Sequence, residues 1–432
     1  MDLVQQDPGL PGLATVLDPE ALAERLAREL SGIEIQKAEC RYVRYKPGTN
    51  CLAAHRVLAS GEWQEVYAKA YRPADAHKVS KAIARAQTPT GLGPGKLLWT
   101  DLLTVVCLFP NDDQIRSLRR LGEATTRARL LRKALPAHPG LWSAELRPLA
   151  YKPDRRFVGQ LRGPDGDLAV VRQYSRSGFT RIGRARTLPV ANGCLRLARP
   201  LGRSERHRFV VLEWLEGRLL GDALRASRFD ARELKRVGWA LAELHRSSPE
   251  GLVERGSQDA VKGLRAVAEA VGFLAPGLED DASRLAAHVA WALGEMPKVM
   301  GTIHGDFYSK QVLLQEKAVA VIDLDSMAFG DPLADVGNFI AHLERDSVRG
   351  SVSSDRVDTY RCSLLEGYRE SGLTVRDGAV DVHTAAALLR LTPHPFRNRE
   401  SRWREQMERL LARARTLLHR SSRCLVSSVK TT

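Results

Sequence analysis

The stretch Ile303–Leu314, IHGDFYSKQVLL, decides the fold together with Ile322–Pro332, IDLDSMAFGDP. The first stretch reads as a loop that enters an apolar strand, and the second begins at the end of another short apolar strand. A turn at residues 315–317 would join the two strands into a hairpin. This hairpin would bring three polar side chains near one another: Asp306, Gln311 and Asp323.

These three side chains suit phosphoryl transfer, a reaction in which positioning and charge neutralisation do most of the catalytic work. Mg²⁺ is a hard cation that takes oxygen ligands, which Asp323 and the side-chain carbonyl of Gln311 could supply. Asp306 could accept or orient the proton of an attacking hydroxyl group. The sequence therefore predicts Mg²⁺-dependent chemistry in this region.

The motifs of this region resemble those of the aminoglycoside phosphotransferase and choline kinase family, small-molecule kinases with a protein-kinase-like fold. The family's His-x-Asp-x-x-x-x-Asn motif corresponds to residues 304–311, its apolar-Asp-x-Asp/Glu strand to 322–325, and its Gly-Asp-Pro-x-x-Asp motif to 330–335. The resemblance covers about residues 144–418. It implies an α+β, two-lobe fold with an antiparallel β N-lobe and a mainly helical catalytic C-lobe.

The resemblance also implies a role for each matching residue of the C-lobe. Asp306 would be the catalytic base, and His304 would brace its loop. Asp323 would be the main Mg²⁺ ligand, with Gln311 at the second ligand position, where the family usually has Asn. Asp325 would be either a carboxylate close to the metal or a structural hydrogen-bond acceptor.

Three residues of the N-lobe would contact the nucleotide. Glu213 and Trp214 would lie at the adenine-facing hinge, and Arg172 takes the place of the family's phosphate-binding lysine. Arginine keeps the charge but presents a planar fork, so this exchange is not conservative. Residues 175–193 also contain no Asp or Glu to act as the usual partner of that lysine.

A second β-rich segment precedes this N-lobe and resembles it. Tyr45-Lys46-Pro47 is matched by Tyr151-Lys152-Pro153, and Lys69-Ala70-Tyr71 by Arg172-Gln173-Tyr174. We interpret this as an internal duplication of a small antiparallel β unit. The alternative is two unrelated hairpins with a similar turn. Lys69 would then belong to a decayed lobe, which acts either as a packing platform or as a source of substrate contacts.

Four segments follow from these patterns. We predict an N-lobe-like β unit with a leading helix over residues 1–135, and a β-rich kinase N-lobe over 140–217. A helical catalytic C-lobe would span 218–420, with a disordered tail over 421–432.

Composition indicates the partners, the redox environment and the location of the protein. The 432 residues include 66 Lys+Arg and 51 Asp+Glu, a formal net charge of +15 that favours anionic partners. The six cysteines have no metal-ligand spacing and indicate reduced thiols. The chain begins without a recognisable signal peptide and contains no apolar run of membrane-spanning length, so we expect a cytoplasmic protein without a membrane partner.

The main prediction is a phosphotransferase that moves the γ-phosphate of ATP or GTP to a hydroxyl group of a small molecule, such as a sugar, an aminoglycoside or a similar metabolite. The alternative is a catalytically inactive kinase-like binding module, in which replacing Asp306 by Ala would change nothing. Nucleic-acid binding driven by the basic charge has little support from the motifs.

Overall fold

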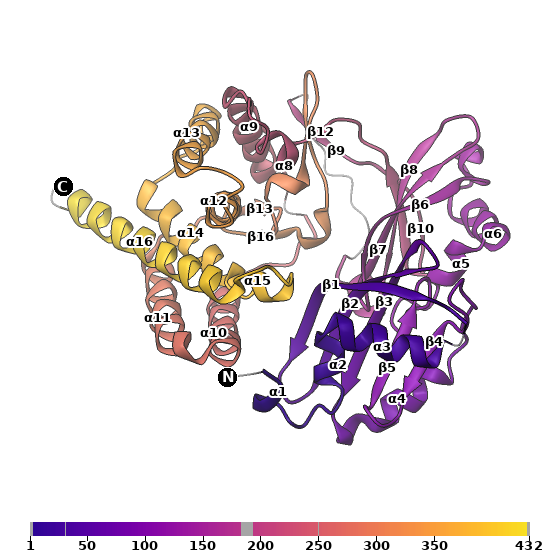
Figure 1. The fold of residues 1–432 in the computed structure, drawn as a ribbon. Helices are drawn as coiled ribbons and strands as arrows, with labels where there is room; N and C mark the ends of the chain where they lie inside the picture. Colours follow the sequence, from indigo (N-terminus) through magenta and orange to yellow (C-terminus); the bar gives the residue numbers. More distant parts are fainter. Residues whose placement is uncertain (1–2, 31, 183–192, 249, 430–432) are drawn as a thin grey trace. The chain divides into compact units, whose positions relative to one another are not determined.

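The computed structural model describes residues 3–30, 32–182, 193–248 and 250–429 (Figure 1). The chain divides into two compact units. Unit 1 contains Met1–Ala185, Arg199–Trp214 and Phe396–Glu400. Unit 2 contains Arg186–Ala198, Leu215–Pro395 and Ser401–Thr432.

The first sheet of unit 1 is antiparallel, with the strand order β1-β2-β3-β5-β4. The turn between β2 and β3 has positive φ at both Ser60 (48°) and Gly61 (81°), as a tight two-residue hairpin requires. The strands are β1 Ile35–Lys46, β2 Asn50–Ala59, β3 Glu62–Tyr71, β4 Lys96–Trp99 and β5 Thr104–Leu108.

Short helices precede this sheet: α1 Leu3–Gln6, α2 Leu13–Leu17 and α3 Pro19–Glu29. Asp18 separates α2 from α3, because its carboxylate accepts the N–H groups of Glu20 and Ala21 and Pro19 occupies the first helical position. Another helix, α4 Ala76–Ile83, follows β3.

The second sheet of unit 1 has the order β10-β11-β8-β7-β6, the same connectivity as the first. Its strands are β6 Glu145–Lys152, β7 Arg156–Arg162, β8 Leu168–Tyr174, β10 Pro200–Ser204 and β11 Phe209–Glu213. Helices again precede it, here α5 Leu118–Gly122 and α6 Ala124–Ala134, and α7 Arg176–Arg181 follows β8. Glu123 caps α6 through the N–H groups of Thr125 and Thr126, much as Asp18 caps α3.

Unit 2 is mainly helical. Its helices surround a core that includes Leu241, Phe307 and Phe339, all fully buried. The helices are α8 Leu220–Ala223, α9 Arg232–Arg246, α10 Ser257–Leu274, α11 Glu279–Glu295, α12 Leu333–Val348, α13 Ser354–Glu370, α14 Asp377–Leu391 and α16 Trp403–Val429, while α15 His394–Arg397 lies at the boundary with unit 1.

Two small sheets complete unit 2 and carry the predicted motifs. The larger sheet has the order β12-β14-β15-β9, in which β9 pairs parallel to β15, and the smaller sheet pairs β13 with β16. The strands are β9 Leu195–Leu197, β12 Arg218–Leu219, β13 Gly301–Ile303, β14 Val312–Leu314, β15 Val319–Val321 and β16 Ala328–Gly330.

The antiparallel sheets and the helical unit confirm the predicted α+β class. A disordered tail was predicted from residue 421, whereas α16 continues to Val429; residues 430–432 lie outside the described part. No helix among the described residues has the length and apolar character needed to cross a bilayer. The five cysteines whose side chains the structure describes form no disulfide.

Candidate active site

A buried carboxylate on α12 holds the backbone of the loop that carries Asp306. Asp335, which is 1% exposed, accepts the N–H of His304 at 2.6 Å and that of Gly305 at 2.8 Å. The same carboxylate lies 3.3 Å from Nε2 of His245 on α9. Asp335 therefore ties the loop to two helices of unit 2, as expected for a loop brace.

Gly305 is required at its position. Its φ is +77°, and a Cβ atom there would collide with the carbonyl oxygen of Ser326. Any residue with a side chain would strain this turn, on which the position of Asp306 depends.

The ring of His304 connects the loop to the strand that follows it. His304 is fully buried; its Nδ1 accepts the backbone N–H of Asp306 at 3.2 Å. Its Nε2 lies 2.9 Å from the carbonyl oxygen of Ile322. Because Nδ1 is an acceptor, Nε2 carries the proton and donates it to Ile322, so the neutral ring bridges Asp306 and the residue before Asp323.

The predicted hairpin brings Gln311 and Asp323 into contact. The backbone N–H of Ile322 donates to the carbonyl of Gln311 at 2.9 Å, and Nε2 of Gln311 lies 3.4 Å from Oδ2 of Asp323. The strand ends at Val321, and Asp323 beyond it adopts a left-handed conformation (φ 65°, ψ 50°). Asp tolerates this conformation better than most residues, and such backbone strain is common at functional sites.

The donor set around Asp323 fits Mg²⁺ together with nucleotide phosphates. Among the described residues no three His, Cys, Asp or Glu side chains come together as a metal cluster. Mg²⁺ often takes only one or two carboxylates and completes its shell with phosphates and water. Gln311 would contribute its oxygen after a turn of its amide, and the half-buried Asp325 lies on the short 3₁₀ turn Leu324–Ser326 that follows Asp323.

Two arginines near Asp306 were not predicted. Burial and the neighbouring Arg255 lower the pKa of Arg390 on α14, while Asp306 acts in the opposite direction. Arg255 also lies beside the loop, since a Cβ on Gly305 would lie 2.7 Å from its Nη1. Neither arginine belongs to a motif, and both are far from Asp306 in sequence, so only the fold could reveal them.

The three residues predicted to contact the nucleotide belong to unit 1, whereas Asp306, Gln311 and Asp323 belong to unit 2. Arg172 lies on the inner strand β8, is 6% exposed and has its guanidinium 5.9 Å from the ring of Tyr174. Glu213 accepts a hydrogen bond from Nε of Arg199 at 3.1 Å, and Trp214 is the last residue before the chain enters unit 2. The predicted lack of an acid over 175–193 falls partly on residues 183–192, outside the described part.

A braced loop beside a hairpin that is followed by a carboxylate, within an α+β protein, agrees with the phosphotransferase class that the motifs predict. Residues 179–371 match the model of the phosphotransferase enzyme family. This match confirms the resemblance over that range, and the predicted enzyme class, a phosphotransferase with an alcohol group as acceptor, agrees with it. No curated protein matches the chain.

Several solved structures resemble the chain. A choline/ethanolamine kinase family protein from Mesorhizobium loti is 19% identical, with a TM-score of 0.47 over 70% of this chain and 98% of the other. Choline kinase from Cryptosporidium parvum is 11% identical, with a TM-score of 0.48 over 71% and 98%. A macrolide 2′-phosphotransferase from Brachybacterium faecium is 19% identical, with a TM-score of 0.42 over 67% and 98%.

Proposed function

We propose that the protein is a Mg²⁺-dependent phosphotransferase that moves the γ-phosphate of ATP or GTP to a hydroxyl group of a small molecule. The observation that carries this proposal is the contact of Gln311 with Asp323, next to a loop that His304 fixes to the same hairpin. Two oxygen-bearing side chains and an exposed carboxylate, Asp306, thus belong to one braced substructure.

Each residue has a distinct role in the proposed reaction. Asp306 accepts or orients the proton of the acceptor hydroxyl, and His304 keeps the Asp306 backbone in place. Asp323 and Gln311 hold Mg²⁺, with Asp325 as a further candidate ligand. When bound, Mg²⁺ neutralises charge on the nucleotide phosphates.

The two arginines near Asp306 extend this proposal. Arg255 and Arg390 place positive charge beside the carboxylate. They would help to position an anionic group close to Asp306, where charge develops during phosphoryl transfer.

Nucleotide binding is assigned to residues of unit 1. Arg172 would contact the phosphates, and the chain at Glu213 and Trp214 would face the base through its backbone amides. The carboxylate of Glu213 pairs with Nε of Arg199 at 3.1 Å, and this role for the backbone amides leaves that pair intact. The acceptor would be a hydroxylated small molecule, such as a sugar, an aminoglycoside or a similar metabolite.

Thermal unfolding with Mg²⁺ and ATP or GTP tests the metal site. A ligand at about a hundred times its dissociation constant stabilises the folded state by about 2.7 kcal/mol. We expect a Mg²⁺-dependent rise in the melting temperature that Asp323→Asn abolishes. Asp358→Asn, which changes an exposed carboxylate of α13, is the matched control and should behave like the wild type.

Turnover separates an active enzyme from a binding module. Asp306→Asn should lower the rate of phosphate transfer by about 10²–10⁴-fold, while the nucleotide-induced rise in melting temperature persists. No turnover of wild-type protein with any hydroxylated acceptor, combined with intact nucleotide binding, would favour the inactive kinase-like module.

A further inference from the structure

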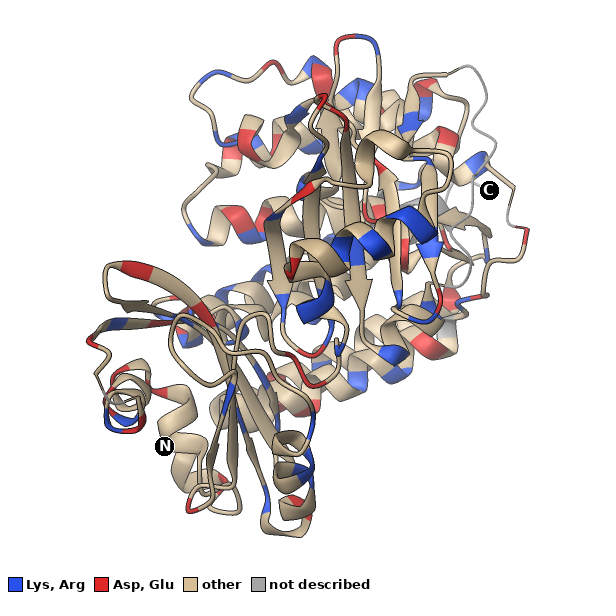
Figure 2. Cartoon of the chain, turned by 90° about the vertical axis from the view of Figure 1, so that its right-hand side faces the viewer, with Lys and Arg blue, Asp and Glu red and all other residues tan. Residues whose placement is uncertain are grey.

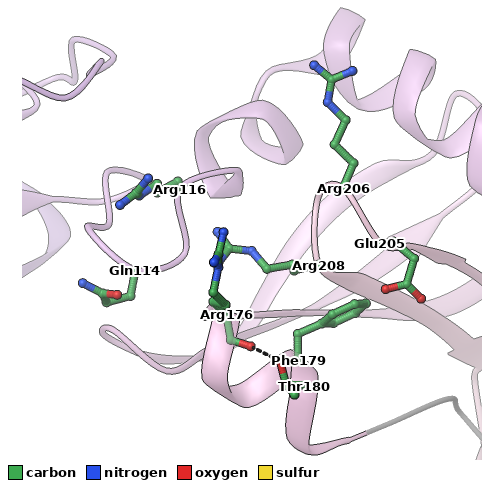
Figure 3. A pocket seen from close by; sticks show the side chains of 8 residues that line it. All are labelled: Gln114, Arg116, Arg176, Phe179, Thr180, Glu205, Arg206 and Arg208. Carbon is green, nitrogen blue, oxygen red and sulfur yellow. Dashed lines mark hydrogen bonds between the residues drawn. The ribbon is translucent and has the colours of Figure 1, made fainter.

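Unit 1 contains a cavity of about 760 Å³ that the proposed reaction does not use. It lies where the loop after β5 meets α7 and the turn between β10 and β11 (Figure 3). None of its lining residues belongs to the motifs of residues 303–335 or to the candidate nucleotide contacts. The lining residues are Gln114, Arg116, Arg176, Phe179, Thr180, Glu205, Arg206 and Arg208.

The charge of this cavity is strongly positive. Four of the eight lining side chains are arginines, and the single acid, Glu205, is already bound to Nε of Arg203 at 2.6 Å. In the part of the chain that the structure describes, no carboxylate forms an ion pair with Arg176, Arg206 or Arg208. The lining therefore carries positive charge that its own acids do not neutralise.

The arginines repel one another at the centre of the cavity. Figure 3 shows the guanidinium groups of Arg176 and Arg208 close together, with Arg116 across from them on the loop. Burial, followed by Arg116 and Arg176, lowers the pKa of the half-buried Arg208. An anion between these groups would relieve the repulsion, because an opposite charge favours the charged form of each arginine.

Arg208 is held in this position by the backbone. Its φ is +55°, and its carbonyl oxygen accepts the N–H of Tyr174 at 2.9 Å, which fixes the start of β11 against β8. A non-glycine residue with positive φ costs conformational energy and persists only where the surroundings impose it. The guanidinium of Arg208 is thus presented from the last residue of a turn whose backbone is hydrogen-bonded to β8.

The positive field extends into a second cavity of about 320 Å³. Figure 2, which views the side where Figure 1 has α5 and α6, shows basic residues along the helix in front. Arg206 lines both cavities and points away from the Arg176–Arg208 pair in Figure 3. The basic residues of the second cavity are Arg120, Arg129, Lys133, Arg203, Arg206 and His207.

We propose that the larger cavity binds a small molecule that carries two or more phosphate groups. Guanidinium groups bind phosphate oxygens through paired, charge-assisted hydrogen bonds, and several of them converge here. The volume falls within the range of small-molecule sites in proteins. This cavity shares no residue with the site of Asp306 and Asp323, so the proposal does not depend on the proposed reaction.

Calorimetric titration with inorganic tripolyphosphate, in the presence of EDTA, tests the proposal on the full-length protein. The wild type should bind, and Arg176→Gln/Arg208→Gln should weaken binding by about tenfold or more, because both guanidinium groups lose their charge-assisted hydrogen bonds to phosphate oxygens. Arg28→Gln/Arg41→Gln removes the same charge from exposed positions of unit 1 and should leave the affinity within about twofold. Asp323→Asn should bind as the wild type does.

A variant that binds more tightly is also needed, because misfolding could explain a loss of affinity but not a gain. Glu205→Gln removes the only acid of the lining, so tripolyphosphate should bind several-fold more tightly. No binding to the wild type, equal weakening in the control pair, or loss in Asp323→Asn would overturn the proposal. Tighter binding of a single-stranded oligonucleotide that also depends on Arg129 and Lys133 would instead assign this surface to nucleic acid.

Discussion

Asp335 shows how one residue sets the geometry of the candidate site without touching substrate. Its carboxylate accepts two successive backbone N–H groups, those of His304 and Gly305, and contacts His245. His245 in turn hydrogen-bonds the hydroxyl of Tyr368 at 2.7 Å through Nδ1. Burial alone would raise the pKa of Asp335, but the contacts with His245 and His304 hold it below its usual value.

We expect Asp335→Asn to destabilise unit 2 by about 3 kcal/mol, because one amide N–H would face the donors that the carboxylate now accepts. An acid whose folded pKa is lowered contributes stability above its unfolded pKa of about 3.9, and this is lost as pH falls through the folded pKa. The difference between wild type and variant should therefore be large at neutral pH and shrink in acid. Urea unfolding across this pH range measures the difference in free energy of unfolding, with Asp358→Asn as the control. A difference that stays constant with pH would contradict a stabilising role for the ionised carboxylate.

At the scale of elements, the two sheets of unit 1 share a detail beyond their strand order. In each, the strand tyrosine just before the β-turn donates to an aspartate that also accepts the backbone N–H of the residue three positions after the tyrosine. In the first sheet Tyr45 and the N–H of Gly48 bind Asp7 at 2.7 and 2.8 Å. In the second, Tyr151 and the N–H of Asp154 bind Asp112 at 2.8 Å each. We propose that a duplicated unit includes these aspartates and the helices that follow them.

If the units are duplicates, equivalent changes should have equivalent effects. Tyr45→Phe and Tyr151→Phe should each lower the free energy of unfolding by about 1 kcal/mol, because each removes one partly buried hydrogen bond and leaves the carboxylate accepting at least one backbone N–H. The two losses in free energy of unfolding should add in the double variant, since Tyr45 and Tyr151 share no hydrogen-bond partner. Tyr42→Phe is the control, because no described residue hydrogen-bonds its hydroxyl. Strongly unequal losses in urea unfolding would contradict the equivalence.

Lys69 illustrates what a pattern in sequence cannot resolve. The sequence matches Lys69 to Arg172, but it does not distinguish a packing role from a substrate contact. The structure pairs it with Asp154 at 2.6 Å, where Arg44 also binds at 3.2 Å, so the lysine of the first sheet joins the turn of the second. Such a pairing depends on residues 85 apart in sequence and could not be read from local propensity.

The part of the candidate site that could be predicted is the part set by residues close together in the sequence. Short apolar runs and a polar turn predicted the hairpin that joins Gln311 to Asp323, and the contact is present. The end of β15 was not predicted, because alternation and β-branching do not reveal the left-handed conformation of Asp323. Arg255 and Arg390 were missed because tertiary packing, rather than any motif, brings them to the loop. Arg390 lies on α14, and the backbone N–H of Arg255 donates to the carbonyl of Phe329 in β16 at 2.8 Å.

At the scale of the whole molecule, the second sheet of unit 1 is completed only after the chain has passed through unit 2. Residues 199–214 supply β10 and β11 to the second sheet, after the chain has contributed β9 to unit 2. The fully buried Phe209 and Val211 of β11 pack in one core cluster with Leu161 and Val171. Without them, β8 would become an edge strand with an exposed apolar face.

A fragment of residues 1–214 should therefore unfold cooperatively on heating, whereas a fragment of residues 1–185 should aggregate or lack a cooperative transition. Circular dichroism and size-exclusion chromatography distinguish the two. Cooperative unfolding of the shorter fragment would show that β10 and β11 are dispensable for the second sheet.

The chain changes from one unit to the other after Ala185, Ala198, Trp214, Pro395 and Glu400. Recombination with a single crossover can exchange only a continuous stretch of a gene, so it could not deliver either unit complete. A chimera with a relative would need several matched breakpoints to retain all strands of both units. The two units are therefore inherited together, and changes in one arise in the presence of the other.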